Sequence, residues 1–273
     1  MQYPHNLNPN DFPSPCFVTD LAKLEENVRI LNTVQERTKA KILLALKGFA
    51  QWKSFPYLSR TMRGSLYGAC ASSVDEARLS KEEFKGEVHA FAAGFSSEDM
   101  QELLTLCDHI TFNSIHQWKK FRPMIIEYNA RHEKKVLCGL RINPEHSEGA
   151  VPIYDPCDKS SRLGIRLKDF ASENLDELFE GITGLHFHTL CEQNSDALDR
   201  TLRVVEEKFA FMLERVSWVN FGGGHHITRE DYDLELLCQC INRVQAKYPV
   251  QIYLEPGEAV ALKAGYLIST GLD

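Results

Sequence analysis

The sequence lacks features that mark several broad classes of protein. Its 273 residues contain no apolar run of the roughly 18 residues that a membrane-spanning helix needs. The first 16 residues, MQYPHNLNPNDFPSPC, have neither a charged n-region nor an apolar h-region, so we expect no signal peptide. No stripe of basic residues accompanies the net charge of −7, so nucleic-acid binding is not predicted.

Paired cysteine motifs are also missing. The eight cysteines are scattered, and no CxxC occurs. This pattern is typical of reduced thiols in a cytoplasmic protein rather than of a disulfide framework. Cys238 and Cys240 lie two residues apart on a predicted helix and point to different faces, which argues against joint metal ligation. We therefore predict a cytoplasmic protein without a metal site.

The sequence does contain a regular alternation of short apolar runs with longer helical patterns. Such alternation indicates parallel βαβ units, and eight of them predict a closed (β/α)₈ barrel of the TIM type. The predicted strands are residues 41–47, 65–70, 87–92, 109–112, 136–142, 181–188, 218–221 and 250–255. The predicted helices between them are residues 52–62, 74–84, 97–106, 115–131, 175–179, 196–215 and 231–247.

Three segments are predicted along the chain. Residues 1–38 hold a short strand and a helix over 21–37, for which Thr19 or Asp20 is a plausible N-cap. Residues 39–258 form the barrel, and its long loop 143–167 is expected at the active site. Residues 259–273 read as the start of another strand, and because a domain rarely ends in mid-strand we expect a further domain.

The barrel predicts which residues face an active site, because the carboxyl ends of its strands carry the catalytic groups. Lys47 closes the apolar run KILLALK, where low-dielectric walls would lower the pKa of its amine and make it nucleophilic. Glu255 ends YLEPGE, and Pro256–Gly257 forces a turn after it. A carboxylate there could keep a pyridine nitrogen protonated. By themselves, a snorkelling lysine and a capping glutamate explain these positions equally simply.

Two further motifs suggest ligand binding. Gly222, Gly223 and Gly224 follow the seventh strand, where successive backbone N–H groups and a following helix N-terminus would suit a phosphate, although a flexible turn is the alternative. His186 and His188 alternate on one strand and share a face, so an imidazole could stack on an aromatic cofactor. Barrel zinc hydrolases offer a competing explanation of the HxH pattern.

The strings LALKGFA, GLHFHTLCEQ, NFGGGHH and YLEPGEA, with PSPCFV before and SRLGI between, resemble carboxynorspermidine (carboxyspermidine) decarboxylase. That family belongs to the fold-type III pyridoxal-phosphate enzymes, with ornithine and diaminopimelate decarboxylases and alanine racemase. The resemblance implies an alanine-racemase-like barrel, pyridoxal 5′-phosphate (PLP) as cofactor and a C-terminal β-domain that is largely absent from this chain. It also implies a homodimer with shared active sites.

The resemblance further implies a role for each matching residue. Lys47 would be the Schiff-base lysine, His188 would stack on the pyridine ring, and Glu255 would pair with the pyridinium nitrogen. Glu258 would contact a cationic carboxy-polyamine, which the net charge of −7 would also favour. The remaining predicted cofactor contacts are Cys191, Gly222, Gly223, Gly224, Gly257 and Arg162, of which Arg162 is equally compatible with a surface position.

The implied activity is decarboxylation of carboxynorspermidine or carboxyspermidine to norspermidine or spermidine. Three alternatives stay open. One is another decarboxylase of this fold, for diaminopimelate, ornithine or arginine. The second is a non-catalytic PLP-binding barrel, and the third is a zinc hydrolase, which would require stoichiometric metal.

Overall fold

Eight parallel strands form a closed barrel, which confirms the predicted fold class. The structure, a computed structural model, describes residues 7–149, 155–158 and 160–272. Each barrel strand pairs with the next along the chain, and the last pairs with the first. All eight predicted strands are present, with ends that differ by at most a few residues. They are β2 (Lys41–Ala45), β3 (Gly68–Ala71), β4 (Glu87–Phe91), β5 (His109–Phe112), β6 (Leu137–Arg141), β7 (Ile182–His186), β8 (Trp218–Asn220) and β9 (Gln251–Leu254).

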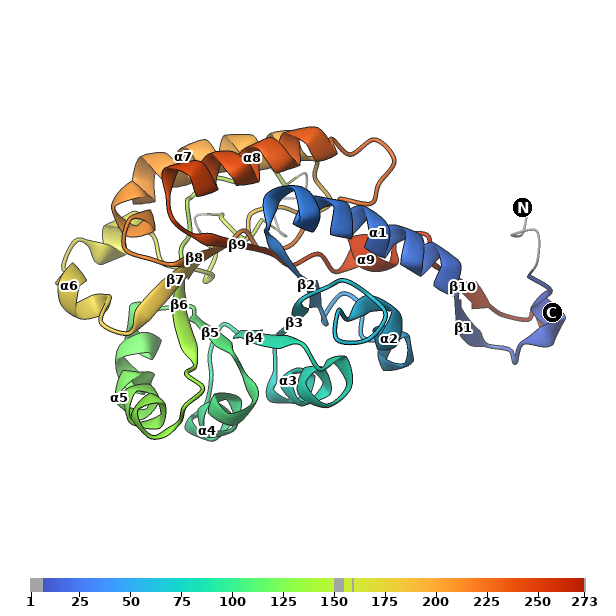
Figure 1. Cartoon of the computed structure of the whole chain (residues 1–273), viewed down its shortest axis with the longest axis horizontal. Coiled ribbons are helices and arrows are strands. Elements are labelled where there is room, and N and C mark those ends of the chain that lie inside the picture. Colours follow the sequence, from blue (N-terminus) through green and yellow to red (C-terminus); the bar gives the residue numbers. More distant parts are fainter. Residues whose placement is uncertain (1–6, 150–154, 159, 273) are drawn as a thin grey trace.

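Helices cover the outside of the strands, with α3 (Val74–Leu79), α4 (Ser97–Leu106) and α5 (Ile115–Arg131) on one side and α7 (Ser195–Leu213) and α8 (Leu234–Lys247) on the other (Figure 1). Two have the predicted ends, α4 (Ser97–Leu106) and α5 (Ile115–Arg131). No described helix is both long and apolar enough to cross a membrane. After β6 come a 3-10 turn, η5 (Leu167–Phe170), and the helices α6 (Leu175–Leu178), α7 (Ser195–Leu213) and α8 (Leu234–Lys247), which correspond to the helices predicted over 175–179, 196–215 and 231–247.

One predicted helix is wrong in extent. Residues 52–62 form only a 3-10 turn, η2 (Trp52–Ser54), and the short α2 (Phe55–Leu58). The chain folds back after α2, because Gly64 packs so tightly that a Cβ there would lie 2.1 Å from the Leu58 carbonyl carbon. The helix predicted over 74–84 is present with those bounds, as α3 (Val74–Leu79) continued by a π-helical turn, η3 (Ser80–Phe84). Its C-cap, Lys85, lies in the left-handed region with φ 61°.

The barrel interior requires glycine on two strands. The Trp218 ring crosses the interior, and its Nε1 donates to Thr183 Oγ1 at 3.0 Å. A Cβ on Gly184 would lie 1.9 Å from that ring, and one on Gly139 would lie 2.4 Å from it. These strand glycines therefore mark a close approach rather than a turn.

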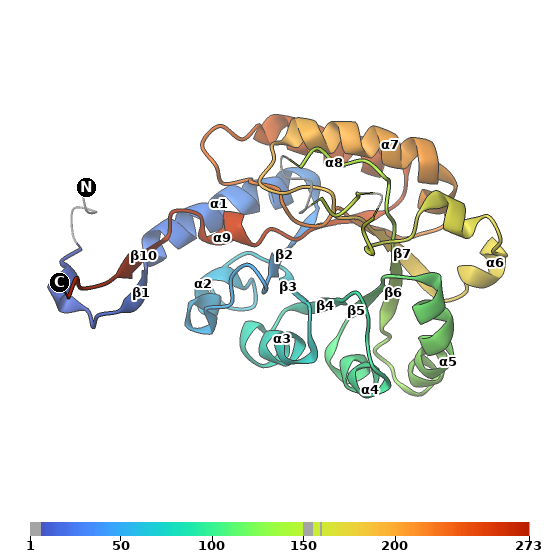
Figure 2. The ribbon, with the colours of Figure 1, turned by 180° about the vertical axis from the view of Figure 1, so that it is seen from behind.

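The segments that flank the barrel pair with each other. The strand β1 (Cys16–Thr19) is antiparallel to β10 (Gly265–Ile268), and both lie beyond one end of α1 (Figures 1 and 2). The helix α1 (Leu21–Thr38) begins at Asp20, whose side chain accepts from the backbone of the first turn. The strand read from the last residues is thus present as β10. The remaining short elements are η1 (Pro9–Asp11) and α9 (Glu258–Ala261).

Candidate active site

A cavity of about 370 Å³ lies at the carboxyl ends of the barrel strands. Most of the predicted site residues line it, although they come from four separate parts of the chain. Residues 150–154 and 159 of the predicted loop 143–167 lie outside the described residues, but Pro156 and Leu163 of that loop also line the cavity. The predicted residues that line it are Lys47, His188, Cys191, Gly223, Gly224, Glu255, Gly257 and Glu258.

Lys47 lies in the turn after β2, which ends at Ala45. The turn is tied to the end of β9, because the Ala45 N–H donates to the Pro256 carbonyl at 3.1 Å. A Cβ on Gly48 would lie 2.9 Å from the Gly257 Cα, so the two turns touch. Lys47 is exposed at the cavity mouth, and the low-dielectric walls predicted around its amine do not enclose it. Burial therefore does not account for a nucleophilic amine at this position.

The glycine loop after β8 is pinned against the end of β7. Gly222 and Gly224 have φ values of +71° and +80°, and a Cβ on Gly224 would lie 2.0 Å from the Leu190 oxygen. Two of the three amides already have protein acceptors. Gly222 N–H donates to Asn220 Oδ1 at 2.8 Å, and Gly223 N–H donates to His188 Nδ1 at 2.9 Å.

This arrangement differs in detail from the predicted phosphate cradle. Three free amides do not face the cavity, and Gly222 does not line it. The next α-helix begins only at Leu234, so its N-terminus does not follow the loop directly. Gly223 and Gly224 do line the cavity, and their lack of side chains leaves the backbone open to a ligand there.

His188 is held as a neutral ring. Because its Nδ1 accepts from Gly223 N–H, the proton of the neutral imidazole lies on Nε2. Burial lowers the pKa of His188 well below its ordinary value, and the nearby cations Arg141 and Lys47 lower it further. A fixed, uncharged, flat ring at the cavity wall suits stacking on an aromatic ligand.

Glu255 is the buried acid of the cavity, with 7% of its surface exposed. Its Oε1 accepts from Asn220 Nδ2 at 2.7 Å, and its Oε2 lies 3.4 Å from His186 Nε2. Burial by itself would raise the pKa of Glu255, but the neighbouring side chains of His186, Cys70 and Asn220 outweigh it and hold that pKa far below its usual range. The carboxylate is therefore ionised at neutral pH.

Arg141 is a cavity residue to which the sequence assigned no role. It ends β6, is 4% exposed, and its guanidinium lies 4.6 Å from the centre of the Phe91 ring. Burial lowers the pKa of Arg141 to about 10, so the group is still a cation at neutral pH. A buried cation at the cavity wall is suited to an anionic ligand group. Its place at a strand end, after an apolar run, was the available signal.

Arg162 does not join the other predicted residues. It is exposed and lines a separate cavity near the start of α5, with His116 and Lys119. Its backbone carbonyl accepts from Asn113 Nδ2 at 2.9 Å, which ties the loop to the end of β5. A cofactor role for this guanidinium has no geometric support in the described residues.

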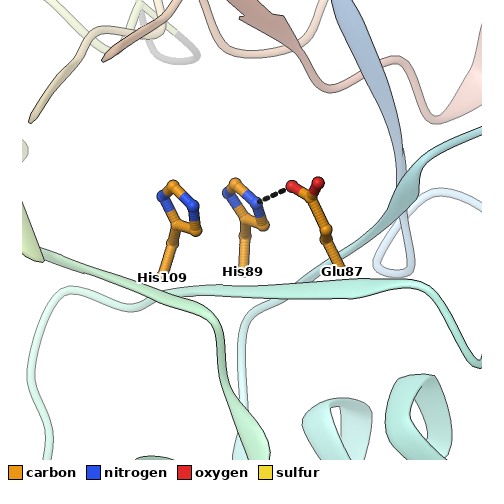
Figure 3. Close-up of side chains that lie close together, drawn as sticks. All are labelled: Glu87, His89 and His109. Atoms are coloured by element: carbon orange, nitrogen blue, oxygen red, sulfur yellow. Dashed lines mark hydrogen bonds and ion pairs between the residues drawn. The ribbon is translucent and has the colours of Figure 1, made fainter. Parts of the chain in front are cut away.

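A second polar cluster occupies the barrel interior near the amino ends of the strands. Glu87, His89 and His109 stand in a row in Figure 3, and one ligand atom from each lies within 4.8 Å of the others. The two imidazoles are stacked, with centroids 4.0 Å apart and planes 9° apart. A metal ion binds an imidazole in the plane of its ring, so parallel rings do not converge on one ion. Glu87 also pairs with the Lys41 ammonium. The cluster is a packed polar layer, and the prediction of no metal site remains untested.

We expect Glu87 to stabilise the fold in a pH-dependent way. Burial alone would raise the pKa of Glu87, but His89 and Lys41 outweigh it and lower that pKa from 4.5 to about 2. A carboxyl with a lowered pKa in the folded state stabilises above its unfolded pKa and loses that contribution as the pH falls through the folded value. Glu87→Gln should therefore lower the free energy of unfolding by about 2 kcal/mol at neutral pH.

Urea unfolding across a pH series measures this effect. The difference between wild type and Glu87→Gln should shrink as the pH falls from about 5 to about 2. The exposed Glu214→Gln on the C-terminal side of α7 is the matched control and should change little at any pH. A gap between wild type and Glu87→Gln that stays constant with pH would contradict the assignment.

In sequence and in fold the chain is similar to decarboxylases of fold type III. No family model matches the chain. The chain is a homologue of carboxynorspermidine decarboxylase: it is 42% identical over 260 residues to the carboxynorspermidine/carboxyspermidine decarboxylase of Campylobacter jejuni, covering 95% of this chain and 64% of that protein. It is also 39% identical over 265 residues to the carboxyaminopropylagmatine decarboxylase of Synechocystis, covering 97% of this chain and 65% of that protein.

Solved structures agree. The crystal structure of carboxynorspermidine decarboxylase from Campylobacter jejuni, complexed with norspermidine, matches with a TM-score of 0.82 and 39% identity, covering 94% of this chain and 63% of that one. Diaminopimelate decarboxylase from Helicobacter pylori matches with a TM-score of 0.76 at 16% identity, covering 94% of this chain and 67% of that one, which shows the shared fold alone. The chain thus spans a little under two thirds of the length of the relatives that it matches at about 40% identity.

Proposed function

We propose that this chain carries the PLP-binding barrel of a decarboxylase of carboxynorspermidine or carboxyspermidine. The observation that supports it best is the single cavity that gathers an amine, a neutral flat imidazole and an ionised carboxylate from Lys47, His188 and Glu255. These three groups match the parts of PLP. The amine can condense with its aldehyde, the imidazole can stack on its flat ring, and the carboxylate can pair with its ring nitrogen. The backbone of Gly223 and Gly224 is suited to the phosphate.

PLP, when bound, supplies an electron sink that accepts the electrons left behind as CO₂ departs. Lys47 would hold the cofactor covalently and give it up to the substrate amine. His188 would lie flat against the ring, with its orientation fixed by the Gly223 N–H. Glu255 would keep a proton on the ring nitrogen, because its own affinity for protons is low. Arg141 would hold an anionic group at the same wall.

Two acidic residues at the cavity are suited to a positively charged substrate. Glu258 and Glu192 line the cavity and are exposed, so their carboxylates meet solvent at its mouth. Glu258 Oε1 lies 3.5 Å from His226 Nε2. We assign Glu258 to the cationic tail of a carboxy-polyamine, in keeping with the norspermidine complex of the Campylobacter jejuni relative. A homodimer with shared sites and a cytoplasmic location with free cysteines complete the proposal.

A second candidate substrate has comparable support. The Synechocystis relative, named for carboxyaminopropylagmatine, is nearly as similar to this chain as the Campylobacter jejuni one. Its substrate carries a guanidinium in place of an ammonium, and the two cations differ in the number and geometry of the hydrogen bonds that they donate. The cationic group at the tail of the substrate therefore distinguishes the two candidate substrates.

Release of CO₂ from competing substrates tests the proposal on the full-length protein loaded with PLP. We expect a kcat/KM for carboxynorspermidine or carboxyspermidine at least about tenfold above that for carboxyaminopropylagmatine, because a site that orders one cationic tail group loses binding energy with another. Diaminopimelate and ornithine serve as controls and should react poorly. A preference for carboxyaminopropylagmatine would select the second candidate, and release from neither class would overturn the decarboxylase assignment for these substrates.

A further inference from the structure

One oxygen of the Glu255 carboxylate is held by Asn220, whose amide is itself oriented by the backbone of Gly222. Asn220 Oδ1 accepts from Gly222 N–H at 2.8 Å, which turns the other end of the amide, Nδ2, toward Glu255 Oε1 at 2.7 Å. The backbone closes the loop, because Glu255 N–H donates to the Gly222 carbonyl at 2.8 Å. One carboxylate oxygen is therefore fixed by β8 and the glycine loop.

The other oxygen, Oε2, faces His186. This histidine ends β7, is 2% exposed, and packs its ring on Phe91 with centroids 5.3 Å apart. Its Nε2 lies 3.4 Å from Glu255 Oε2, and neither ring nitrogen makes a well-formed hydrogen bond to another described residue. A buried N–H without an acceptor is costly, and the Glu255 carboxylate is the acceptor beside it. Contacts in sites without ligand are often long and shorten when the ligand is bound.

We propose that His186 is a positioning residue, which donates from Nε2 to Oε2 of Glu255 and with Asn220 holds the carboxylate facing the cavity. The inference rests on the proposed function, because an oriented carboxylate matters there only if a pyridine nitrogen lies in front of it. His186 itself does not line the cavity and acts through Glu255. The HxH pair thus has two roles, one ring at the cavity wall and one behind the acid.

A structural role alone would not predict the pH dependence that this contact implies. Burial tends to raise the pKa of Glu255, and His186 is the first of the groups that lower it. Without His186 the carboxyl takes up a proton at a higher pH and no longer pairs with a protonated ring nitrogen. The pH below which PLP binding weakens should therefore be higher without His186. The other charged, titratable or hydrogen-bonding groups around Glu255 are Lys47, Cys70, Arg141, His188, Asn220 and His225.

The experiment measures the dissociation constant of PLP, by its absorbance on binding, across a pH series for three variants. His186→Leu should weaken binding about tenfold at neutral pH and shift the acid limb upward, since a hydrogen bond to a charged group is lost. His186→Gln keeps an N–H donor at a similar distance and should stay within about threefold of wild type, since the donor is retained. His116→Leu, an exposed histidine on α5, is the matched control.

A second measurement observes the contact in the wild-type protein and uses a variant only to assign the signal. In wild-type protein with ¹⁵N-labelled histidine, the His186 signal, assigned by its loss in His186→Gln, should show the proton on Nε2. A proton on Nδ1 would overturn the inference, as would wild-type affinity and an unshifted acid limb in folded His186→Leu. If wild-type protein binds no PLP, the proposed function fails, while the nitrogen spectrum still decides the His186–Glu255 contact.

Discussion

Replacing Lys47 with alanine is expected to abolish covalent attachment of PLP and to lower kcat for CO₂ release by at least about 10³-fold, since no other nucleophile takes over the exchange with substrate. The physical reason is position, because Lys47 is the sole lysine among the described residues that line the cavity. The change removes an exposed side chain after β2, so the fold should persist. Absorbance of the bound cofactor, together with a CO₂ assay, measures both effects.

Lys53→Ala serves as the control for this prediction. Lys53 is also an exposed lysine, six residues further on in η2, and it lies outside the cavity. It should leave the absorbance band and the rate unchanged. A Lys47→Ala protein whose cofactor band equals that of wild type would show that another group holds the cofactor.

Replacing Glu255 with glutamine is expected to lower kcat by about 10²-fold or more, because an amide does not favour a proton on the ring nitrogen as a carboxylate does. The substitution keeps the size of the side chain and keeps an oxygen that can accept from Asn220 Nδ2. Weaker binding of PLP should accompany the loss but should be smaller than the loss in kcat. Steady-state kinetics with saturating cofactor separates the two.

Glu230→Gln, an exposed acid that does not line the cavity, is the matched control and should behave as wild type. If Glu255→Gln retained the wild-type kcat with saturating PLP, Glu255 would not be the partner of the ring nitrogen. This outcome would leave the Lys47 prediction intact, because the two residues act on different atoms of the cofactor.

The barrel could be predicted from the sequence because local hydrophobic patterns encode its strands and helices. Apolar runs such as the one over 41–47, separated by amphipathic helices, leave few ways to bury every strand other than a parallel barrel. Helix ends were predictable where a cap residue marks them, as Ser96 does for α4 and Ser114 for α5. The helix predicted over 52–62 failed because Gly64 approaches the Leu58 backbone, a contact that no local pattern encodes.

The candidate site was predictable in part for the same reason. In a parallel barrel every strand delivers its carboxyl end to one face, so Lys47, His188 and Glu255 meet there despite their distance in sequence. Arg162 lies within the loop 143–167 rather than at a strand end, so its place in a separate cavity did not follow from that rule. The amides of Gly222 and Gly223 were predicted for a phosphate, yet they have protein acceptors in the fold.

The sequence by itself determined the fold class, the resemblance to carboxynorspermidine decarboxylase and the gathering of a lysine, a histidine and an acid at one barrel mouth. Those features depend on hydrophobic periodicity and on the positions of strand ends, which short stretches of the sequence encode. Only the tertiary structure decided the partners: the Gly223 amide that makes His188 neutral, the Asn220 and His186 side chains that hold Glu255, and the buried cation Arg141. These contacts join residues on different strands, and their distances exist only once the barrel has closed.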